Sequence, residues 1–386
     1  MGEGPPLACL KVYMSGVLWG LKGDAPDQFG CHEDAHLLEG GDDTRGAPCS
    51  KTPVYRLAEL KNVRPYRGDT AADAPRLNGV VLNGVAESER HSMQTKPSII
   101  AVDMDGTFLT DSKTFDTERF SRILSRLQAQ GIHFVVASGN TYAKLQDYMR
   151  GFEGRGLIYI AENGAYLADE SGQLAVHPFE EEDVPRIIEV VQGLDQIGLL
   201  VCTTEGIYLP KDRCDQIVHM IRGYFEDTGQ ELPETLTLED FAAFFFPGSV
   251  MVDSIEDFEG APIKFPLLTP PKQTRQLSVY LREALPQTVT PMVSGFGAID
   301  LVRTGVNKAT GLKDLCERLD ADPAGILAFG DGENDMEMLR YAGWGVAMSN
   351  APEVVRNAAD EVIGSNEEQA VLDYLEQLLD CLEASQ

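Results

Sequence analysis

Acidic residues gather in two short motifs, Asp103-Met104-Asp105-Gly106-Thr107 and Gly330-Asp331-Gly332-Glu333-Asn334-Asp335. Each motif directly follows a short apolar run, at residues 98–102 and 326–329, of the kind that forms a buried parallel strand. In an open parallel sheet, ligands bind beyond the carboxyl ends of the strands. Two carboxylates that meet there at about 4 Å repel each other by about 4 kcal/mol at an effective dielectric of about 20. A divalent cation removes that repulsion, and ligands that are all oxygen favour Mg²⁺.

Each acidic motif has a second interpretation, because a solvated surface turn can have the same sequence. Gly106 permits the unusual backbone that is needed just beyond Asp103 and Asp105, which favours a built site. A calcium loop needs ligands spread over about twelve residues, and the second motif lacks that spacing. The two motifs therefore indicate a magnesium site.

Two further segments offer groups that bind phosphate. Ser138-Gly139-Asn140 follows the apolar run 132–137 and supplies a hydroxyl and backbone N–H groups near a helix N-terminus. Lys308 begins an expected helix after Gly305-Val306-Asn307. Neither segment is specific alone, since such turns are common and a lysine at this place is often exposed. Beside the acidic motifs, they fit a phosphate bound next to Mg²⁺.

The elements that must position these motifs alternate along the chain. Strands are expected at 98–102, 132–137, 157–161, 299–302, 326–329 and 344–348, and helices from Asp116 or Thr117 to Gly131, at 142–149, 308–319 and 335–341. This alternation predicts a doubly wound α/β domain with a mostly parallel, Rossmann-like sheet. A middle segment instead mixes helical periods with short strands and prolines, which predicts an inserted α+β domain.

These patterns divide the chain into three parts. Residues 93–177 and 289–386 form the expected core, and 178–288 form the insert. Gly and Pro make up 19 of residues 1–92, and no sustained helical or strand period occurs there. We expect a poorly ordered or non-native N-terminal extension, with a small regulatory or targeting domain as the alternative.

Composition excludes several classes of function. Asp and Glu total 61 against 32 Lys and Arg, a net charge of −29, which argues against a nucleic-acid or anionic-membrane partner. No apolar run reaches the roughly 18 residues of a membrane span. Seven scattered cysteines without a CxxC pair indicate reduced thiols and no zinc site. We therefore expect a cytoplasmic protein, either a monomer or a small homo-oligomer.

Taken in order, the four motifs resemble those of the haloacid dehalogenase-like hydrolases. The size and place of the insert resemble the Cof branch, which has a large α+β cap. Residues 161–165, 294–301 and 307–309 further resemble the corresponding segments of the SupH-type bacterial sugar phosphatases. Many Cof relatives have arginine at the position of Asn140, whereas the SupH-type proteins resemble this chain there. The resemblance covers about residues 97–380.

The resemblance implies a role for each motif residue. Asp103 is the nucleophile that forms an aspartyl-phosphate, Asp105 is the general acid and then the base, and Lys308 offsets the negative charge. The implied Mg²⁺ ligands are Asp103, the backbone carbonyl of Asp105, and Asp331, with Asp335 orienting the cluster. The implied substrate-binding residues are Gly106, Thr107, Ser138, Gly139, Asn140, Asn163, Lys264 and Asn334; Tyr208 and Thr203 are further candidates in the cap.

The function that follows is an Mg²⁺-dependent phosphatase of small phosphate monoesters, above all phosphorylated sugars or sugar alcohols. A nucleotide or vitamin phosphate is an alternative substrate, and phosphoryl transfer to a second sugar is an alternative reaction. A phosphosugar-binding module without catalysis is a different class of function. The presence of both Asp103 and Asp105 favours the enzyme.

Overall fold

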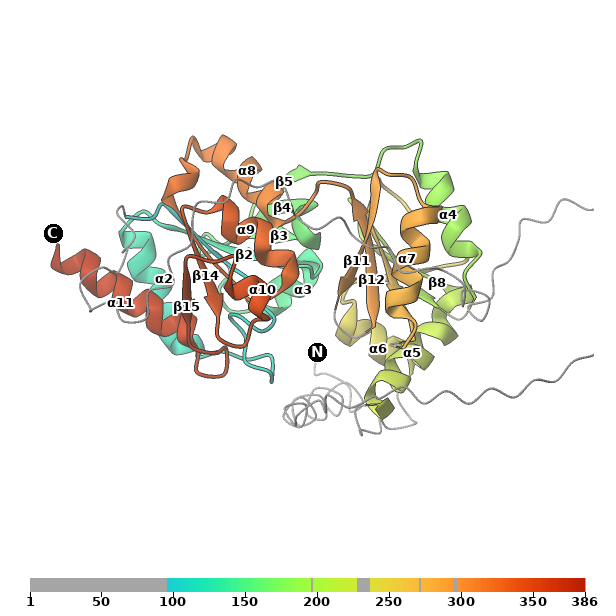
Figure 1. The fold of residues 1–386 in the computed structure, drawn as a ribbon, viewed down its shortest axis with the longest axis horizontal. Helices are drawn as coiled ribbons and strands as arrows, with labels where there is room; N and C mark the ends of the chain where they lie inside the picture. Colours follow the sequence, from blue (N-terminus) through green and yellow to red (C-terminus); the bar gives the residue numbers. More distant parts are fainter. Residues whose placement is uncertain (1–95, 196, 228–236, 271, 295–296, 386) are drawn as a thin grey trace, which may run out of the picture.

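The computed structural model describes residues 96–195, 197–227, 237–270, 272–294 and 297–385, which form two lobes lying side by side (Figure 1). The expected extension 1–92 lies outside the described residues. Within these ranges, no helix combines the length and the apolar character that crossing a membrane requires.

The first lobe, the core, is built on an eight-stranded sheet. In spatial order its strands are β15 (Glu361–Ile363), β14 (Trp344–Met348), β13 (Ile326–Gly330), β1 (Ile99–Val102), β2 (His133–Ala137), β3 (Ile158–Ala161), β4 (Tyr166–Asp169) and β5 (Gly172–Val176). The strands from β15 to β3 run parallel, and β4 and β5 add an antiparallel hairpin at one edge. The predicted doubly wound, mostly parallel sheet is confirmed.

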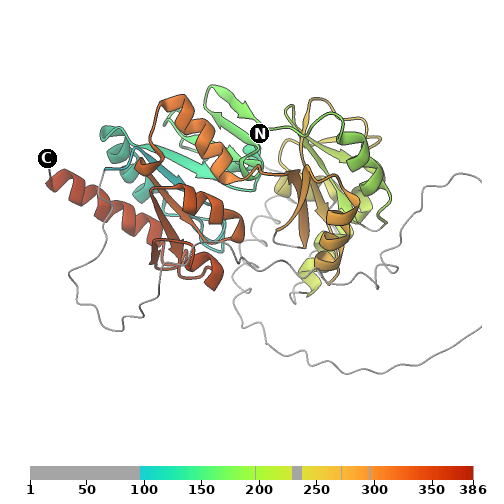
Figure 2. The same cartoon turned by 45° about the horizontal axis from the view of Figure 1, so that its top comes forward.

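Helices cover both faces of the core sheet (Figure 2). On one face lie α2 (Thr117–Ala129), α3 (Tyr142–Tyr148) and α11 (Ala370–Ala384); on the other lie α8 (Lys308–Leu319), α9 (Met336–Tyr341) and α10 (Glu353–Arg356). Successive residues of a strand point to opposite faces, so Ile100 packs in the first layer and Ala101 in the second. This burial on both sides explains why the strands are continuous apolar runs.

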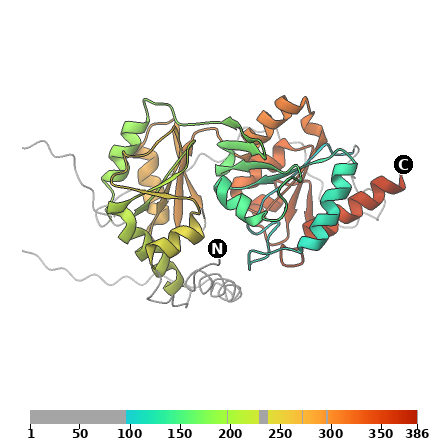
Figure 3. The ribbon, with the colours of Figure 1, turned by 180° about the vertical axis from the view of Figure 1, so that it is seen from behind.

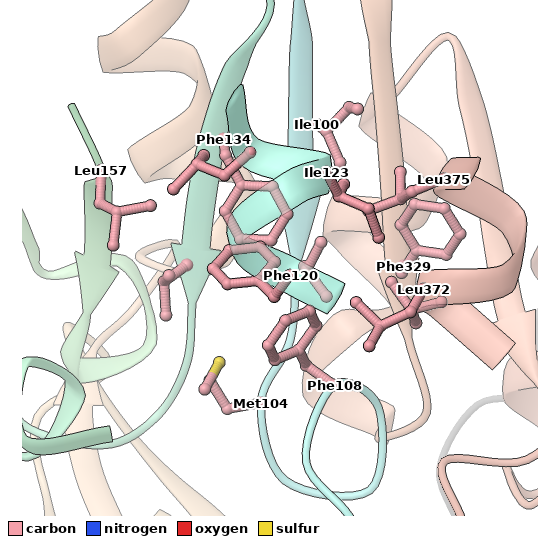
Figure 4. Close-up of a cluster of buried hydrophobic side chains, with 14 of the residues drawn as sticks. Ile100, Met104, Phe108, Phe120, Ile123, Phe134, Leu157, Phe329, Leu372 and Leu375 are labelled. Carbon is pink, nitrogen blue, oxygen red and sulfur yellow. The ribbon is translucent and has the colours of Figure 1, made fainter. Parts of the chain in front are cut away.

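Aromatic packing holds α2 against the sheet (Figure 4). The ring centroid of Phe120 lies 5.0 Å from that of Phe108 and 5.0 Å from that of Phe134. Asp116 caps the helix by accepting a 2.8 Å hydrogen bond from the backbone N–H of Arg119. Because Phe108 belongs to the loop after β1, the same cluster fixes the turn that carries the first acidic motif.

The second lobe, the cap, contains a mostly antiparallel sheet. Its spatial order is β11 (Val289–Ser294), β12 (Ala298–Arg303), β10 (Pro262–Leu268), β7 (Val201–Thr203), β8 (Ile207–Pro210) and β9 (Val250–Val252), and β6 (Gly198–Leu199) also pairs with β10. Helices α4 (Val184–Gln192) and α7 (Thr274–Ala284) pack on one face, while α5 (Cys214–Asp227) and α6 (Leu238–Phe245) pack on part of the other (Figure 3). This arrangement confirms an inserted α+β domain.

The predicted boundary of the insert at residue 288 is wrong, because the cap continues to Arg303. Strand β12 was expected to return the chain to the core sheet, but it pairs antiparallel with β10 and with β11 in the cap. An apolar run of this length suits either sheet, and only its pairing partner distinguishes the two. The chain therefore re-enters the core at α8, which begins at Lys308.

Candidate active site

The two acidic motifs meet at one edge of the core sheet. Strand β1 pairs in parallel with β13, with Val102 opposite Phe329, so the residues that follow the two strands are neighbours. Carboxylate oxygens of Asp103, Asp331 and Asp335 lie within 4.8 Å of one another. The predicted convergence of the two motifs is therefore present in the fold.

Lys308 lies between two of these carboxylates and is completely buried. Its Nζ donates hydrogen bonds of 2.5 Å to Asp103 Oδ1 and 2.5 Å to Asp335 Oδ1. The lysine is the first residue of α8, which Asn307 caps by accepting from the Thr310 N–H at 3.2 Å. The start of this helix therefore places one positive charge among three carboxylates.

The buried charges shift one another's pKa values. Burial raises the pKa of Asp103 well above its usual range, although Lys308 opposes the shift. Burial and the neighbouring charge of Asp335 raise the pKa of Asp331 to about 6. Burial alone would lower the pKa of Lys308, but Asp103 and Asp335 raise it overall. Three carboxylates against one lysine leave two negative charges when all are ionised, which a divalent cation would neutralise.

Close backbone packing keeps the carboxylate of Asp331 in this cluster. Gly106 has a φ of +84°, and a Cβ there would lie 2.3 Å from Asp331 Oδ2. Thr107 Oγ1 donates a 2.9 Å hydrogen bond to Asp331 Oδ1, and the side chain of Asn350 donates to the carbonyl of Gly106 at 2.8 Å. The atoms that could bind a metal here are all oxygen atoms, and the backbone of Gly106 packs closely against the carboxylate of Asp331. These residues therefore fit a small, hard cation.

Asp335 is oriented by the turn that follows β13. Its Oδ2 accepts hydrogen bonds from the backbone N–H groups of Asp331 at 3.0 Å and Gly332 at 2.8 Å, while Oδ1 accepts from Lys308. Both oxygens thus have partners within the protein. This geometry suits a residue that fixes the positions of Lys308 and the turn.

The side chain of Asp105 lies apart from the other three carboxylates. Its Oδ2 accepts a 2.6 Å hydrogen bond from Asn140 Nδ2, and its Oδ1 forms an ion pair with Lys113. Asn140 also donates to Ser138 Oγ at 3.1 Å through both its backbone and its side chain. The Ser138-Gly139-Asn140 turn therefore lies against the first acidic motif, as the order of the motifs predicts.

A strained turn after β3 completes this edge. Glu162 and Asn163 have positive φ values of 52° and 55° in the short 3₁₀ helix Glu162–Gly164. Asn163 Oδ1 accepts a 3.0 Å hydrogen bond from Asn334 Nδ2, which joins two predicted substrate-binding residues. Lys264 reaches across from the cap and donates to the carbonyl of Gly139 at 2.9 Å.

Two cap candidates are not brought to this edge. Tyr208 packs in the cap's own core against α4 and α7. Thr203 Oγ1 donates a 2.6 Å hydrogen bond to the carbonyl of Glu259 within the cap. Both side chains therefore have partners within the cap, and their contact with a substrate stays a prediction.

Sequence reasoning missed three polar residues at the site. Lys113 lies in a polar loop without any distinguishing pattern, and its partner Asp105 becomes apparent only in the fold. Glu162 lies within a segment that resembles the family, yet its pairing with Lys264 depends on the cap. Asn350 had a usable signal, because it follows the apolar strand β14 as the acidic motifs follow β1 and β13.

We expect Gly106→Ala to destabilise the protein by about 2–4 kcal/mol, because the added methyl group combines backbone strain with a clash against Asp331. Gly131→Ala is the matched control: its φ is +68°, but nothing lies within 4 Å of the added Cβ. It should cost only about 1 kcal/mol, the strain alone. Chemical unfolding of the two variants gives the comparison, and equal losses would show that Gly106 is needed only for its φ.

Comparisons with known proteins identify the family of this chain. The family model of the haloacid dehalogenase-like hydrolases matches residues 100–375. The Escherichia coli protein named 5-amino-6-(5-phospho-D-ribitylamino)uracil phosphatase YbjI is 32% identical over 281 residues, which span 73% of this chain and 96% of that protein. A Bacillus subtilis protein of the same named activity, YitU, is 26% identical, over 74% of this chain and 98% of its own length.

A solved structure shows the same fold. The crystal structure of SMU.1108c from Streptococcus mutans UA159 superposes with a TM-score of 0.62 and 31% sequence identity, covering 74% of this chain and 100% of that one. Residues 100–375, which the family model matches, include parts of both lobes and all four motifs. The chain therefore belongs to the haloacid dehalogenase-like hydrolases, in their Cof branch.

Proposed function

We propose that this protein is an Mg²⁺-dependent phosphatase that hydrolyses small phosphate monoesters, in particular phosphorylated sugars or sugar alcohols, through an aspartyl-phosphate. One observation carries the proposal: the buried Lys308 is bonded to Asp103 and Asp335 at 2.5 Å, with Asp331 beside them at the strand ends. A lysine and a cation site next to a carboxylate are what an anionic nucleophile needs to approach an anionic phosphate.

Asp103 is the proposed nucleophile. Lys308 holds its Oδ1, which fixes the carboxylate and lowers the electrostatic cost of bringing a phosphate close to it. The carboxylate forms a bond to phosphorus as the bond from phosphorus to the leaving alcohol breaks. Asp105, protonated at this step, gives its proton to the leaving oxygen.

Asp105 acts as a base in the second step. It takes a proton from a water molecule whose oxygen bonds to phosphorus, while the bond between phosphorus and Asp103 breaks and inorganic phosphate leaves. The 2.6 Å hydrogen bond from Asn140 orients the carboxylate for both transfers. Ser138, Gly139, Asn163 and Asn334 surround the same space and are the proposed contacts for the phosphate oxygens, along with Gly106 and Thr107.

Asp103, the backbone carbonyl of Asp105, and Asp331 would hold the Mg²⁺, with Asp335 orienting them. When bound, Mg²⁺ neutralises charge on the phosphate and helps to position it. Because a carboxylate must lose its proton to bind a metal, the pKa of about 6 for Asp331 implies weaker binding below that pH.

The named activities of the relatives support a polyol-bearing substrate. YbjI and YitU are both named for a phosphate on a ribityl chain, which is a sugar alcohol. Other relatives are named HMP-PP phosphatase, from Serratia proteamaculans, and phosphoglycolate phosphatase, from Methanopyrus kandleri. A test of substrate preference therefore has to include phosphates other than those of sugars.

The purified protein should release inorganic phosphate from sugar and sugar-alcohol phosphates when Mg²⁺ is present. Excess EDTA should lower the rate at least about a hundredfold, and excess Mg²⁺ should restore it, because the acidic cluster otherwise repels the phosphate. Phosphate release from a panel of monoesters, including nucleotide, vitamin and glycolate phosphates, measures substrate preference. Undiminished rates in EDTA count against the metal, and no hydrolysis of any monoester rules out the phosphatase.

A further inference from the structure

Three charged side chains are buried where the cap meets the core. Glu162 comes from the strained turn after β3 in the core, Lys264 from β10 and Asp300 from β12 in the cap. Their exposed fractions are only 4%, 4% and 7%. Buried charges are costly unless each has a partner, so the pairing within this group decides what it can do.

The side chains of Lys264 and Asp300 are on the same face of the cap sheet. Phe265 and Leu301, their neighbours in sequence, pack into the cap's own core with α4 and α7. Because successive residues of a strand alternate between faces, Lys264 and Asp300 point to the other side. Lys264 there contacts the carbonyl of Gly139 in the core, so this side faces the core lobe.

Lys264 is fully engaged, and Asp300 is not. Lys264 donates to Gly139 and forms an ion pair with Glu162. Among the described residues, Asp300 has no hydrogen bond and no cation within 4.0 Å. Its charge still attracts Lys264 and, with that of Glu162, raises the pKa of Lys264 against the effect of burial. Two carboxylates and one lysine leave an excess negative charge, and burial raises the pKa values of both Glu162 and Asp300.

Lys264 joins this group to the turn beside Asp105, next to which the leaving alcohol of the proposed reaction would lie. Gly139, the acceptor for Lys264, precedes Asn140, whose amide holds Asp105. Asp105 is the proposed acid for the leaving oxygen, so the remainder of the alcohol extends from there toward the cap. Asp300 offers it two acceptor oxygens and no donor.

We propose that Asp300 is a specificity-determining residue whose carboxylate accepts a hydrogen bond from a hydroxyl group of the leaving alcohol. Lys264 is its positioning residue, since it joins the cap sheet to the turn beside Asp105. A buried acceptor without a hydrogen-bond partner weakens the binding of an alkyl chain and strengthens the binding of a hydroxyl group, because only the hydroxyl can donate a hydrogen bond to it. The inference rests on the proposed function for the direction in which the leaving alcohol extends.

Ligand binding tests this role separately from hydrolysis. In an Asp103→Asn background with Mg²⁺, calorimetry compares ribitol 5-phosphate with n-pentyl phosphate, which has the same chain length without hydroxyl groups. We expect the ribitol compound to bind at least about tenfold more tightly. Adding Asp300→Leu, which keeps a similar volume but accepts no hydrogen bond, should reduce that ratio at least about tenfold. Asp300→Asn retains one acceptor oxygen and should reduce it less.

Stability distinguishes this role from a structural one. Removing a buried, unpartnered carboxylate should leave Tm unchanged or raise it, whereas loss of a structural contact would lower it. Glu283→Gln is the control, because Glu283 is exposed on α7, which covers the opposite face of the cap sheet. It removes one negative charge from the cap and should leave the ratio of the two affinities unchanged.

Several results would overturn the proposal. They are equal binding of the two phosphates before Asp300 is changed, an unchanged ratio in both Asp300 variants, and a lower Tm in both. Tighter binding of 5-aminopentyl phosphate than of ribitol 5-phosphate would also overturn it, in favour of an amine ligand. If the ratio depends on Asp300 but the unmodified protein hydrolyses no phosphate ester, the binding role stands and the proposed function fails.

Discussion

Asp103→Asn is expected to lower kcat at least about 10⁴-fold while the protein stays folded. An amide oxygen is a far weaker nucleophile than a carboxylate, so the first step of hydrolysis should not proceed. Asparagine has the same shape, and its Oδ1 can still accept the 2.5 Å hydrogen bond from Lys308. Because burial makes the charge of Asp103 costly, its removal should not lower Tm by more than a few degrees.

The matched comparison for this variant is Asp105→Asn assayed with p-nitrophenyl phosphate. Its leaving group needs no proton, so Asp105→Asn should still release a burst of about one equivalent of p-nitrophenol before the slow second step. Asp103→Asn should show no burst. Rapid-quench kinetics measures the burst, and a burst or steady turnover in Asp103→Asn would falsify the assignment of the nucleophile.

The core sheet and its motifs could be predicted because their physical causes are local. A strand that is buried on both faces must be a continuous apolar run, as residues 99–102 are. Helix α8 begins at Lys308 and ends at Leu319, as expected, because Asn307 is a strong cap. The two acidic motifs come together because β1 and β13 are adjacent parallel strands, and parallel strands present their carboxyl ends at the same edge.

The boundary of the cap could not be predicted in the same way. Strand β12 has an apolar run that suits a core strand, but β10 supplies its pairing partner. Asp300 within that run is the one local conflict, since a charged residue in a buried strand needs a reason. The apolar pattern of β12 does not indicate that Asp300 is buried at the junction between the lobes.

Individual partners within the site depend on tertiary packing. Lys264 is a predicted substrate contact, and in the fold it also donates to Gly139 and pairs with Glu162, partners that its place in the sequence does not indicate. Thr107 likewise donates to Asp331, a contact that its motif alone does not indicate. Residue type and spacing identify which side chains reach the same edge, and the pairing among them follows from the packing of segments far apart in the chain.

Lys308→Met is expected to destabilise the protein by about 3–5 kcal/mol and to lower kcat at least about 10³-fold. The ammonium group is completely buried between Asp103 and Asp335, so its loss leaves both carboxylates in the interior without their cation. Lys313→Met is the control, because Lys313 is an exposed residue of the same helix. That change should alter stability by less than about 0.5 kcal/mol.

The effect of Lys308→Met on stability should depend on pH, with a definite sign. Burial already raises the pKa of Asp103 in the folded protein, and removing Lys308 removes the interaction that opposes this shift. A carboxylate with a raised folded-state pKa costs nothing below its unfolded pKa and costs most above its folded pKa. The destabilisation should therefore be larger at pH 7.5 than at pH 5. Urea unfolding in EDTA at the two pH values measures it; a loss that is equal at both, or no larger than that of Lys313→Met, would contradict a buried ion pair at this position.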